Sequence, residues 1–340
     1  MRVLIVGGVF GRDDEYRRSI NPTPEMTLSR GLRERGVDVV TAGHTWRHRL
    51  DGIDVVHVHH VAKSLPLLAG LRPLHRVPLV FTRHNEERTL PAARAASLRL
   101  MNRAADAMVA LSHQEAARLR AQVRCPVTVI RNGIDPPERV TPPVRPADGE
   151  HWRLLYAGQL IPRKGIDVLL RALAAIRPTT PVALRLVFHN PGQLAELRAL
   201  AEQLGLADVV EFVGRKDVAG MAAEYERTNA LVLPSRAEAE SLPSVITESL
   251  LANRPVVATD DAGVPEQVLH GGVLARPGDV DDMAAAIRRL VTDYDVYAEG
   301  ARKRSDELHP EYDVATMIDR HLEVYESVLA GRRAMRRAAL

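Results

Sequence analysis

Cysteine, aromatic residues and long apolar runs are all scarce in this 340-residue sequence. Cys125 is the only cysteine, so the chain cannot form the intramolecular disulfides on which small secreted domains depend, and a reducing compartment fits. Aromatic residues make up 4% of the chain, with no zinc-ligand spacing and no helix-turn-helix pattern, so we expect no nucleic-acid partner. No stretch approaches the roughly 18 consecutive apolar residues of a membrane-spanning helix, so no transmembrane segment is expected.

The first residues, MRVLIVGGVF, also lack the features of a secretion signal. One arginine precedes a short apolar run, without a long hydrophobic region or a small-residue cleavage site. We interpret this run as a buried strand and predict a cytoplasmic protein.

The distribution of charge along the chain leaves open a peripheral contact with a membrane. Residues 1–145 hold 23 Lys and Arg against 14 Asp and Glu, whereas residues 146–340 hold 23 against 29. The tail adds four arginines, namely Arg332, Arg333, Arg336 and Arg337. Such basic surfaces suit peripheral contact with the anionic inner face of a membrane, although scattered surface arginines and a solvated terminus are the simpler interpretation.

Short apolar runs alternate along the chain with longer stretches of helical periodicity. The runs cover residues 2–8, 37–43, 54–60 and 78–84, and then 153–158, 184–190, 209–214, 230–235 and 255–260. This alternation predicts parallel sheets covered by helices on both faces, with strands that are apolar throughout because neither face meets water. Between the two series, residues 136–149 contain five prolines and no apolar periodicity, which is typical of an interdomain linker.

The sequence therefore predicts an α/β protein with two doubly wound, Rossmann-like domains that face a central cleft. We place the domains at residues 1–140 and 151–308, joined by a proline-rich linker at 141–150. A last helix near Thr316 to Leu329 carries an apolar stripe and must pack against another element. We predict that residues 309–340, which include the basic tail, return to the N-terminal domain. In such sheets the carboxyl ends of the strands carry the ligand.

One loop of the second domain combines cations with the start of a helix. Gly158 ends a strand, and Arg163, Lys164 and Gly165 precede the next helical stretch. Free backbone N–H groups and the positive end of the helix dipole favour an anion there, and a lysine adds a counter-charge suited to a diphosphate. Basic residues before helices are also common on solvated loops, so this pattern alone leaves both interpretations open.

A pair of glutamates follows later in the same domain. Glu240 and Glu248 are eight residues apart, and Pro243 between them suits the first turn of a helix. Glu240 then lies in the loop at the carboxyl end of a strand, with Glu248 one turn into the helix. Carboxylates at these positions can accept hydrogen bonds from sugar and ribose hydroxyls. For an isolated pair, two surface glutamates on an amphipathic helix would be the better interpretation.

The surrounding motifs resemble those of retaining glycosyltransferases, especially family 4, in order along nearly the whole chain. Glu240-Ser-Leu-Pro-Ser-Val-Ile-Thr-Glu248 resembles their E-x7-E motif. The N-terminal half matches in Asp54-Val-Val-His-Val-His59, Phe81-Thr-Arg-His84, Ala105-Asp-Ala-Met-Val-Ala-Leu-Ser112 and Val129-Ile-Arg-Asn-Gly-Ile-Asp135. The C-terminal half adds Lys164-Gly165, Pro234-Ser235, Pro255-Val-Val-Ala-Thr259, Gly263-Val-Pro-Glu266 and Ala275-Arg-Pro-Gly-Asp279.

The resemblance implies the GT-B fold, with an acceptor-side N-terminal domain and a C-terminal domain that binds a nucleotide sugar. It implies catalytic roles for His84, Glu240 and Lys164: the histidine faces the reacting centre, the glutamate contacts the transferred sugar and the lysine pairs with the diphosphate. Glu248 would hold the ribose hydroxyls. The full expected donor-binding set is Gly7, Gly8, Gly158, Gln159, Arg163, Lys164, Glu240, Ser241, Leu242, Glu248 and Gly263. The alternative for His84 is a satisfied histidine at a strand end, which the resemblance makes the less favoured interpretation.

The expected reaction is hexosyl transfer to an unidentified acceptor hydroxyl. Enzymes of this kind are thought to work by front-face departure and attack through an oxocarbenium-like state, so preorganised cations and amides must meet the charge on the leaving diphosphate. No cofactor is expected beyond the nucleotide-diphosphate sugar, with UDP as the favoured nucleotide. Asp293-Tyr-Asp295 lies in a helical stretch and is not a convincing metal motif, so no metal is expected. His57, His59 and His60 are interpreted as structural.

Four departures from the family pattern bear on these roles. Gln159 stands where the family usually has a diphosphate-binding arginine, and His189-Asn190-Pro191-Gly192 stands where a glycine-rich turn is common. Ala252-Asn253-Arg254 replaces the usual Ala-x-Gly, and Ala237 and Glu238 are extra residues before Glu240. Glu238 is therefore a second candidate for the sugar contact.

Two other functions stay open at this point. The first is a non-catalytic sugar-nucleotide-binding protein, suggested by Gln159 and the unusual turn at His189. The second is a nucleotide-sugar epimerase, which can share the fold but has no acceptor site. Retention of Lys164, Glu240 and Glu248 favours the transferase. The oligomeric state, the donor base and the acceptor are not defined by the sequence.

Overall fold

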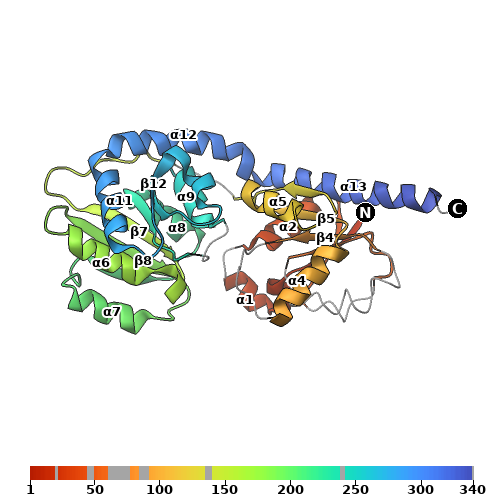
Figure 1. Cartoon of the computed structure of the whole chain (residues 1–340), viewed down its shortest axis with the longest axis horizontal. Helices are drawn as coiled ribbons and strands as arrows, with labels where there is room; N and C mark the ends of the chain where they lie inside the picture. The colour runs from red at the N-terminus through yellow and green to blue at the C-terminus, as the bar shows by residue number, and fades with distance from the viewer. Residues whose placement is uncertain are drawn as a thin grey trace. The chain divides into compact units, whose positions relative to one another are not determined.

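The computed structural model describes residues 1–19, 22–43, 50–59, 77–83, 92–134, 140–237 and 242–338. The chain forms two compact units (Figure 1). Unit 1 comprises Met1–Asp135 and Glu311–Leu340, and unit 2 comprises Pro136–Pro310. Each unit is an α/β layer structure around one parallel sheet.

The sheet of unit 1 has its first strand in an inner position. Its strands are β1 (Arg2–Val6), β2 (Asp38–Ala42), β3 (Val55–Val58), β4 (Leu79–Thr82), β5 (Ala107–Ala110) and β6 (Val127–Val129). They are all parallel, in the order β2-β1-β3-β4-β5-β6. Strand order reverses between β1 and β3, which makes their carboxyl ends the switch point at which such sheets bind ligands.

The helices of unit 1 come from both ends of the chain. They are η1 (Gly8–Gly11), α1 (Asp14–Ser19), α2 (Pro24–Glu34), α4 (Ala92–Ala104), α5 (His113–Arg120) and α13 (Val314–Ala338). Helix α13 packs against α2, where a side-chain carbon at Gly31 would lie 2.5 Å from Ile318. Met317, Ile318 and Tyr325 of α13 therefore share one buried cluster with the strands β1, β3, β4 and β5.

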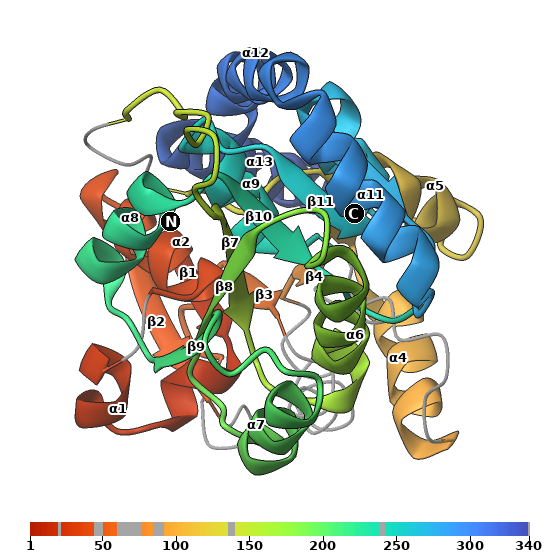
Figure 2. The ribbon, with the colours of Figure 1, turned by 90° about the vertical axis from the view of Figure 1, so that its left-hand side faces the viewer.

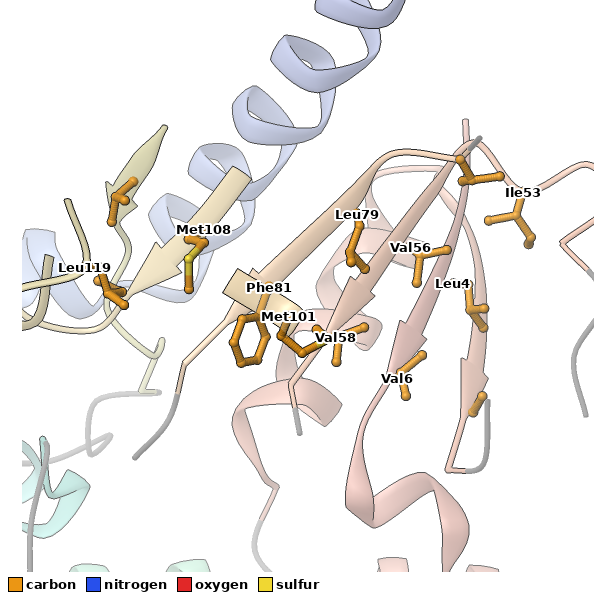
Figure 3. Close-up of a cluster of buried hydrophobic side chains, with 14 of the residues drawn as sticks. Leu4, Val6, Ile53, Val56, Val58, Leu79, Phe81, Met101, Met108 and Leu119 are labelled. Carbon is orange, nitrogen blue, oxygen red and sulfur yellow. The ribbon is translucent and has the colours of Figure 1, made fainter. Parts of the chain in front are cut away.

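A second buried cluster fills the other face of this sheet. Figure 3 shows Leu4, Val6, Val56, Val58, Leu79 and Phe81 from three neighbouring strands, with Met101 of α4 beside Phe81. Phe81 and Met101 are at most 1% exposed. Because both faces of the sheet are covered, the strands are largely apolar, as the sequence pattern predicts.

Unit 2 repeats this architecture with a different strand order. Its strands are β7 (Trp152–Gly158), β8 (Val182–Phe188), β9 (Val210–Gly214), β10 (Ala230–Leu233), β11 (Val256–Thr259) and β12 (Gly272–Ala275). They lie parallel in the order β12-β11-β10-β7-β8-β9. The reversal falls between β7 and β10, so these two strands flank the switch point of unit 2.

The helices of unit 2 cover both faces of its sheet. They are η5 (Pro162–Lys164), α6 (Ile166–Ile176), α7 (Leu194–Gln203), α8 (Val218–Arg227), α9 (Ser244–Leu251), α10 (Val264–Val268), η6 (Leu269–Gly271), α11 (Val280–Thr292) and α12 (Tyr294–Tyr312). Right-handed crossovers place α6 and α7 on one face and α8, α9 and α10 on the other. Figure 2 shows α6 and α8 on opposite sides of β7 and β8. Helix α11 packs on α6.

The segment before β7 has no helix or strand between residues 140 and 151, but it is held to unit 2. The Val144 carbonyl accepts a hydrogen bond from the Asn229 side chain, and the guanidinium of Arg145 lies over the ring of Trp152. No helix within the described residues is both long enough and apolar enough to cross a lipid bilayer.

Candidate functional site

The loop after β7 begins with a hydrogen bond that fixes Gln159. The phenol of Tyr156, which is fully buried, donates to the carbonyl of Gln159 at 2.7 Å. Gly158 makes this possible, because a side-chain carbon there would lie 2.7 Å from the same phenol oxygen. Gly158 and Gln159 both belong to the expected donor-binding set, and the structure places them at the carboxyl end of β7, beside the switch point.

The cation-bearing turn follows in the same loop and is locked to the end of β10. Arg163 and Lys164 lie in η5, and Gly165, with φ of 66°, links this turn to α6. A side-chain carbon at Gly165 would lie 2.1 Å from the Pro234 carbonyl oxygen, so only glycine fits. Arg163 is exposed and Lys164 is half-buried.

Arg236 completes this junction from the other strand. Its backbone N–H donates to the Arg163 carbonyl at 2.8 Å, and its guanidinium pairs with Asp167 of α6 at 2.7 Å. The loop after β7 is thus joined to the first residues after β10 at the switch point. Sequence reasoning missed Arg236, because it stands just before the motif of paired glutamates and carries no motif of its own.

The loop after β8 lies against the loop after β7. Leu160 donates its N–H to the Asn190 carbonyl at 3.0 Å, and Gln193 donates to the Leu160 carbonyl at 2.8 Å. Gly192 is pressed onto the same carbonyl, since a side-chain carbon there would approach it to 2.4 Å. The unusual turn at residues 189–192 is therefore fixed by backbone contacts.

Gln159 and His189, two of the departures from the family pattern, lie close together between the loops after β7 and β8. Nε2 of Gln159 lies 3.4 Å from Nε2 of His189. Partial burial lowers the pKa of His189, and the positive charges of Arg215, after β9, and Lys164 lower it further. The loops after β7, β8 and β9 thus bring three basic side chains to one edge of the sheet.

Glu248 lies on α9, one turn from its first residue. Its Oε2 accepts a 2.8 Å hydrogen bond from the phenol of Tyr225, on α8. Burial raises the pKa of the Glu248 carboxyl, whereas hydrogen bonds from Tyr225 and Ser244 act to lower it. Burial also raises the pKa of Tyr225, as does the charge of Glu248, so the phenol remains a donor. Tyr225 lacks any sequence motif and was not anticipated.

The loop after β11 places Gly263 at the start of α10. Gly263 is buried and Ala262 before it has φ of 45°, a left-handed conformation that is uncommon outside glycine. Helix α10 is tied to α9, because the side chain of Gln267 donates to the Pro243 carbonyl at 3.1 Å and to the Thr247 hydroxyl at 2.9 Å. Leu242, just before α9, is 9% exposed.

Several expected site residues fall outside the described ranges. These are His84, Glu238, Glu240 and Ser241, together with His60. Residues on either side are placed: Arg83 follows β4, where its guanidinium lies 3.6 Å from the buried carboxylate of Glu115.

In unit 1, Gly7 directly follows β1 at the switch point and Gly8 begins η1. A side-chain carbon at Gly7 would lie 2.7 Å from the side chain of Glu25, so close packing within unit 1 already requires glycine there. The buried His57 bridges two hydroxyls, those of Tyr325 and Thr82, each 2.6 Å from one ring nitrogen. This arrangement agrees with a structural role for His57, and the tilted ring of His59 has its centroid 4.3 Å from that of His57.

The third departure, Arg254, is part of the core of unit 2. It is 2% exposed and its guanidinium donates to the carbonyls of Tyr225, Glu226 and Ala252 and to both oxygens of Thr141. These carbonyls lie at the ends of α8 and α9, where backbone oxygens lack partners within the helix. Asn253 before it has φ of 57°, which suits the end of a helix. Arg254 thus joins the segment before β7 to two helices.

Within the described ranges, no group of three or more His, Cys, Asp or Glu side chains is placed to hold a metal ion. The site that these ranges do contain is the carboxyl edge of unit 2, with Gln159, Lys164 and His189 on one side and Glu248 on α9. Its cations and amides can bind a diphosphate, and its partly buried carboxylate can accept hydrogen bonds from hydroxyls.

Comparison with known proteins gives matches over both units. The family described as "Glycosyltransferase Family 4" matches residues 15–138, and "Glycosyl transferases group 1" matches residues 139–305. A glycogen synthase of Mycobacterium tuberculosis is 30% identical over 316 residues, which cover 89% of this chain and 73% of that protein. A D-inositol 3-phosphate glycosyltransferase of Geodermatophilus obscurus is 29% identical, over 84% of this chain and 69% of that protein.

Two solved structures share the fold over almost the whole chain. Sucrose-phosphate synthase from Thermosynechococcus elongatus superposes with a TM-score of 0.79 at 20% identity, covering 97% of this chain and 99% of that one. HepE of Anabaena, solved with UDP-glucose, gives a TM-score of 0.71 at 20% identity, covering 96% and 100%.

Proposed function

Because this chain belongs to the GT-B glycosyltransferases related to family 4, we propose that it transfers a hexose from a nucleoside diphosphate to an acceptor hydroxyl with retention of the anomeric configuration. We propose further that it needs no metal ion and acts in the cytoplasm. Unit 2 binds the donor, and unit 1 presents the acceptor.

The observation that carries this proposal is the locked junction at the switch point of unit 2. Gly165 packs on the Pro234 carbonyl, and Arg236 joins both loops. This holds Lys164 and the first turn of α6 in place before any ligand arrives. Preorganised cations and amides stabilise charge on a leaving diphosphate without reorganisation during the reaction. A rigid cationic edge therefore supports phosphate-leaving chemistry.

The roles of the individual residues follow from their chemistry. Lys164 donates to diphosphate oxygens and supplies a compact positive charge. Glu248, held by Tyr225, accepts from the ribose hydroxyls. To Glu240 we assign the contact with the transferred sugar, and to His84 a catalytic role, as the family resemblance implies. The departing phosphate takes the proton of the acceptor hydroxyl, so no protein base is required. The acceptor oxygen attacks the anomeric carbon directly, on the face from which the diphosphate leaves, so no protein nucleophile is required either.

The donor is proposed to carry uracil. HepE of Anabaena was solved with UDP and with UDP-glucose, which supports this choice. Curated relatives also include mannosyltransferases that are named as dependent on GDP-mannose. A guanine donor is therefore the first alternative to test.

The decisive experiment is incubation with UDP-glucose, GDP-mannose and an adenine nucleotide sugar, with a mixture of polyol, glycan and lipid acceptors, followed by mass spectrometry. We expect one donor to lose its sugar to an acceptor, in the presence of EDTA as well as without it. Proton NMR of the product then gives the anomeric configuration. An altered sugar still attached to the nucleotide would instead indicate an epimerase, and binding without turnover would indicate a non-catalytic protein.

A further inference from the structure

The two departures Gln159 and His189 are 30 positions apart in the sequence but form one contact in the structure. Their Nε2 atoms lie 3.4 Å apart at neighbouring strand ends. The pairing register explains this, because Gly158 of β7 is opposite Phe188 of β8 and the next residue of each strand enters its loop. The backbone hydrogen bonds between Leu160, Asn190 and Gln193 hold both loops in this position.

The chemistry of this pair differs from that of an arginine at position 159. A guanidinium has five N–H donors and no acceptor, so it can face only a neutral imidazole nitrogen. A glutamine amide offers both a donor and an acceptor. Its NH2 group can donate to the neutral ring nitrogen, and its oxygen can accept from the same nitrogen once that is protonated. Gln159 is therefore compatible with both protonation states of His189.

The surroundings keep the ring neutral while the site is empty. His189 is exposed at the edge of the sheet, with Lys164 of η5 and Arg215 after β9 as the charged groups that act on it. Both are cations, and they lower the pKa of the imidazole beyond the effect of its partial burial. A diphosphate bound beside Lys164 would reverse this balance, because its negative charge neutralises the cations and attracts a proton.

We propose that His189 takes up a proton when the donor diphosphate binds and becomes an additional cation of the phosphate site, beside Lys164. This inference rests on the proposed function. Donor affinity is then linked to pH: it is highest where the bound imidazole is protonated and falls as the pH rises through the pKa of that bound form. The decrease approaches about tenfold per pH unit between the free and bound pKa values.

The test is calorimetry of the full chain with UDP-glucose at pH 7, in two buffers of different ionisation enthalpy such as Pipes and imidazole. UDP-glucose is suitable because its diphosphate is a diester without a group that titrates near neutral pH. We expect uptake of up to about one proton per bound ligand, and weaker binding at pH 8 than at pH 6. In His189→Gln both effects should disappear, while the melting temperature stays unchanged because this side chain is exposed.

A double variant tests whether the positive charge or the His189 side chain itself is needed for donor binding. In Gln159→Arg/His189→Gln the arginine supplies a permanent cation, so affinity at pH 8 should exceed that of the single variant and show no proton linkage. Proton uptake that persists in His189→Gln, or binding by the wild-type chain without uptake, would refute the role of His189 and leave the transferase intact. Failure of UDP-glucose, GDP-mannose and an adenine nucleotide sugar to bind at all would refute the proposed function itself.

Discussion

The phenol of Tyr225 donates a 2.8 Å hydrogen bond to Oε2 of Glu248 and so orients the carboxylate that we assign to the donor ribose. The two residues come from different helices, α8 and α9. Because burial raises the pKa of Glu248, each hydrogen bond that lowers it helps to keep the carboxylate ionised.

Tyr225→Phe should therefore weaken nucleotide binding with little change in packing. We expect affinity for UDP to fall by about five- to tenfold, the scale of one hydrogen bond. The loss should grow as the pH falls, because without the phenol the pKa of Glu248 rises further and the ionised form is lost at a higher pH. Tyr294→Phe is the matched control, since its phenol donates to the Asn229 carbonyl in the same unit. Equal losses in the two variants, measured by calorimetry, would contradict the assignment.

Glu248→Gln and Glu240→Gln should fail in different ways. Glu248→Gln loses the ribose contact, so it should weaken the binding of free nucleoside diphosphate as well as that of the donor. Glu240→Gln loses the sugar contact, so it should leave the binding of the product nucleotide unchanged and reduce turnover. Each effect should be about 1–3 kcal/mol. The affinity of both variants for UDP, measured together with kcat, distinguishes the two roles. If Glu240→Gln weakens UDP binding as much as Glu248→Gln does, Glu238 becomes the next candidate for the sugar contact.

Lys164→Ala should weaken donor binding and reduce turnover by orders of magnitude, because Gln159 offers no permanent charge to share the diphosphate. Arg163 is the one neighbour in η5 that could compensate. Lys303→Ala, which removes an exposed lysine from α12, serves as the control. Unchanged affinity of the Lys164 variant for every nucleotide that binds the wild type would rule out the diphosphate contact.

Gly165→Ala tests the locked junction. The φ of 66° alone disfavours alanine, by about 1 kcal/mol. The 2.1 Å approach to the Pro234 carbonyl adds overpacking worth about 1–3 kcal/mol. Gly205→Ala isolates the first effect, because Gly205 has φ of 69° with no atom within 4 Å of the added carbon. Urea unfolding should show a larger loss for Gly165→Ala, and equal losses would mean that the two loops move apart freely.

The stability of unit 1 should depend on pH through His321. Burial lowers its pKa from 6.5 to about 4. As the pH falls below 6.5 the unfolded chain binds a proton that the folded unit excludes, so stability decreases until pH 4, by about 3 kcal/mol in total. Hydrogen exchange of the β3 and β4 amides at several pH values measures this. In His321→Leu the stability of unit 1 should change less with pH over the same range. An unchanged slope of stability against pH would mean that other groups cause the pH dependence.

The fold was largely predictable from the sequence, because strands buried on both faces form continuous apolar runs. All nine runs that we identified contain strands. The strands β5, β6 and β12 were not assigned as strands, since β6 has only three residues and β5 and β12 begin and end in alanine or glycine, which are depleted in strands. The last helix extends further than predicted, to Val314–Ala338, because its polar end does not contribute to the apolar stripe.

The site was less accessible to sequence reasoning. Lys164, Gln159 and Gly158 could be selected from their place after a strand, and the structure puts them there. Tyr225, the hydrogen-bond partner of Glu248, could not be selected from the sequence, because their contact depends on how α8 packs beside α9. Arg254 was noted only as an unusual residue, and its burial against helix ends follows from tertiary packing that no local pattern records. The contact of Gln159 with His189 could have been found by assuming in-register pairing of β7 and β8.

Helix α13 has a consequence for the order in which the chain folds during synthesis. Met317, Ile318 and Tyr325 complete the buried cluster on one face of unit 1, yet they leave the ribosome after every residue of unit 2. Unit 2 is contiguous in sequence, so it can close its core first, while the earlier strands of unit 1 wait with an uncovered apolar face. Exposed apolar surface of this kind is prone to aggregate in partly folded chains. The nascent protein should therefore depend on chaperone protection of its first half until its last helix is made.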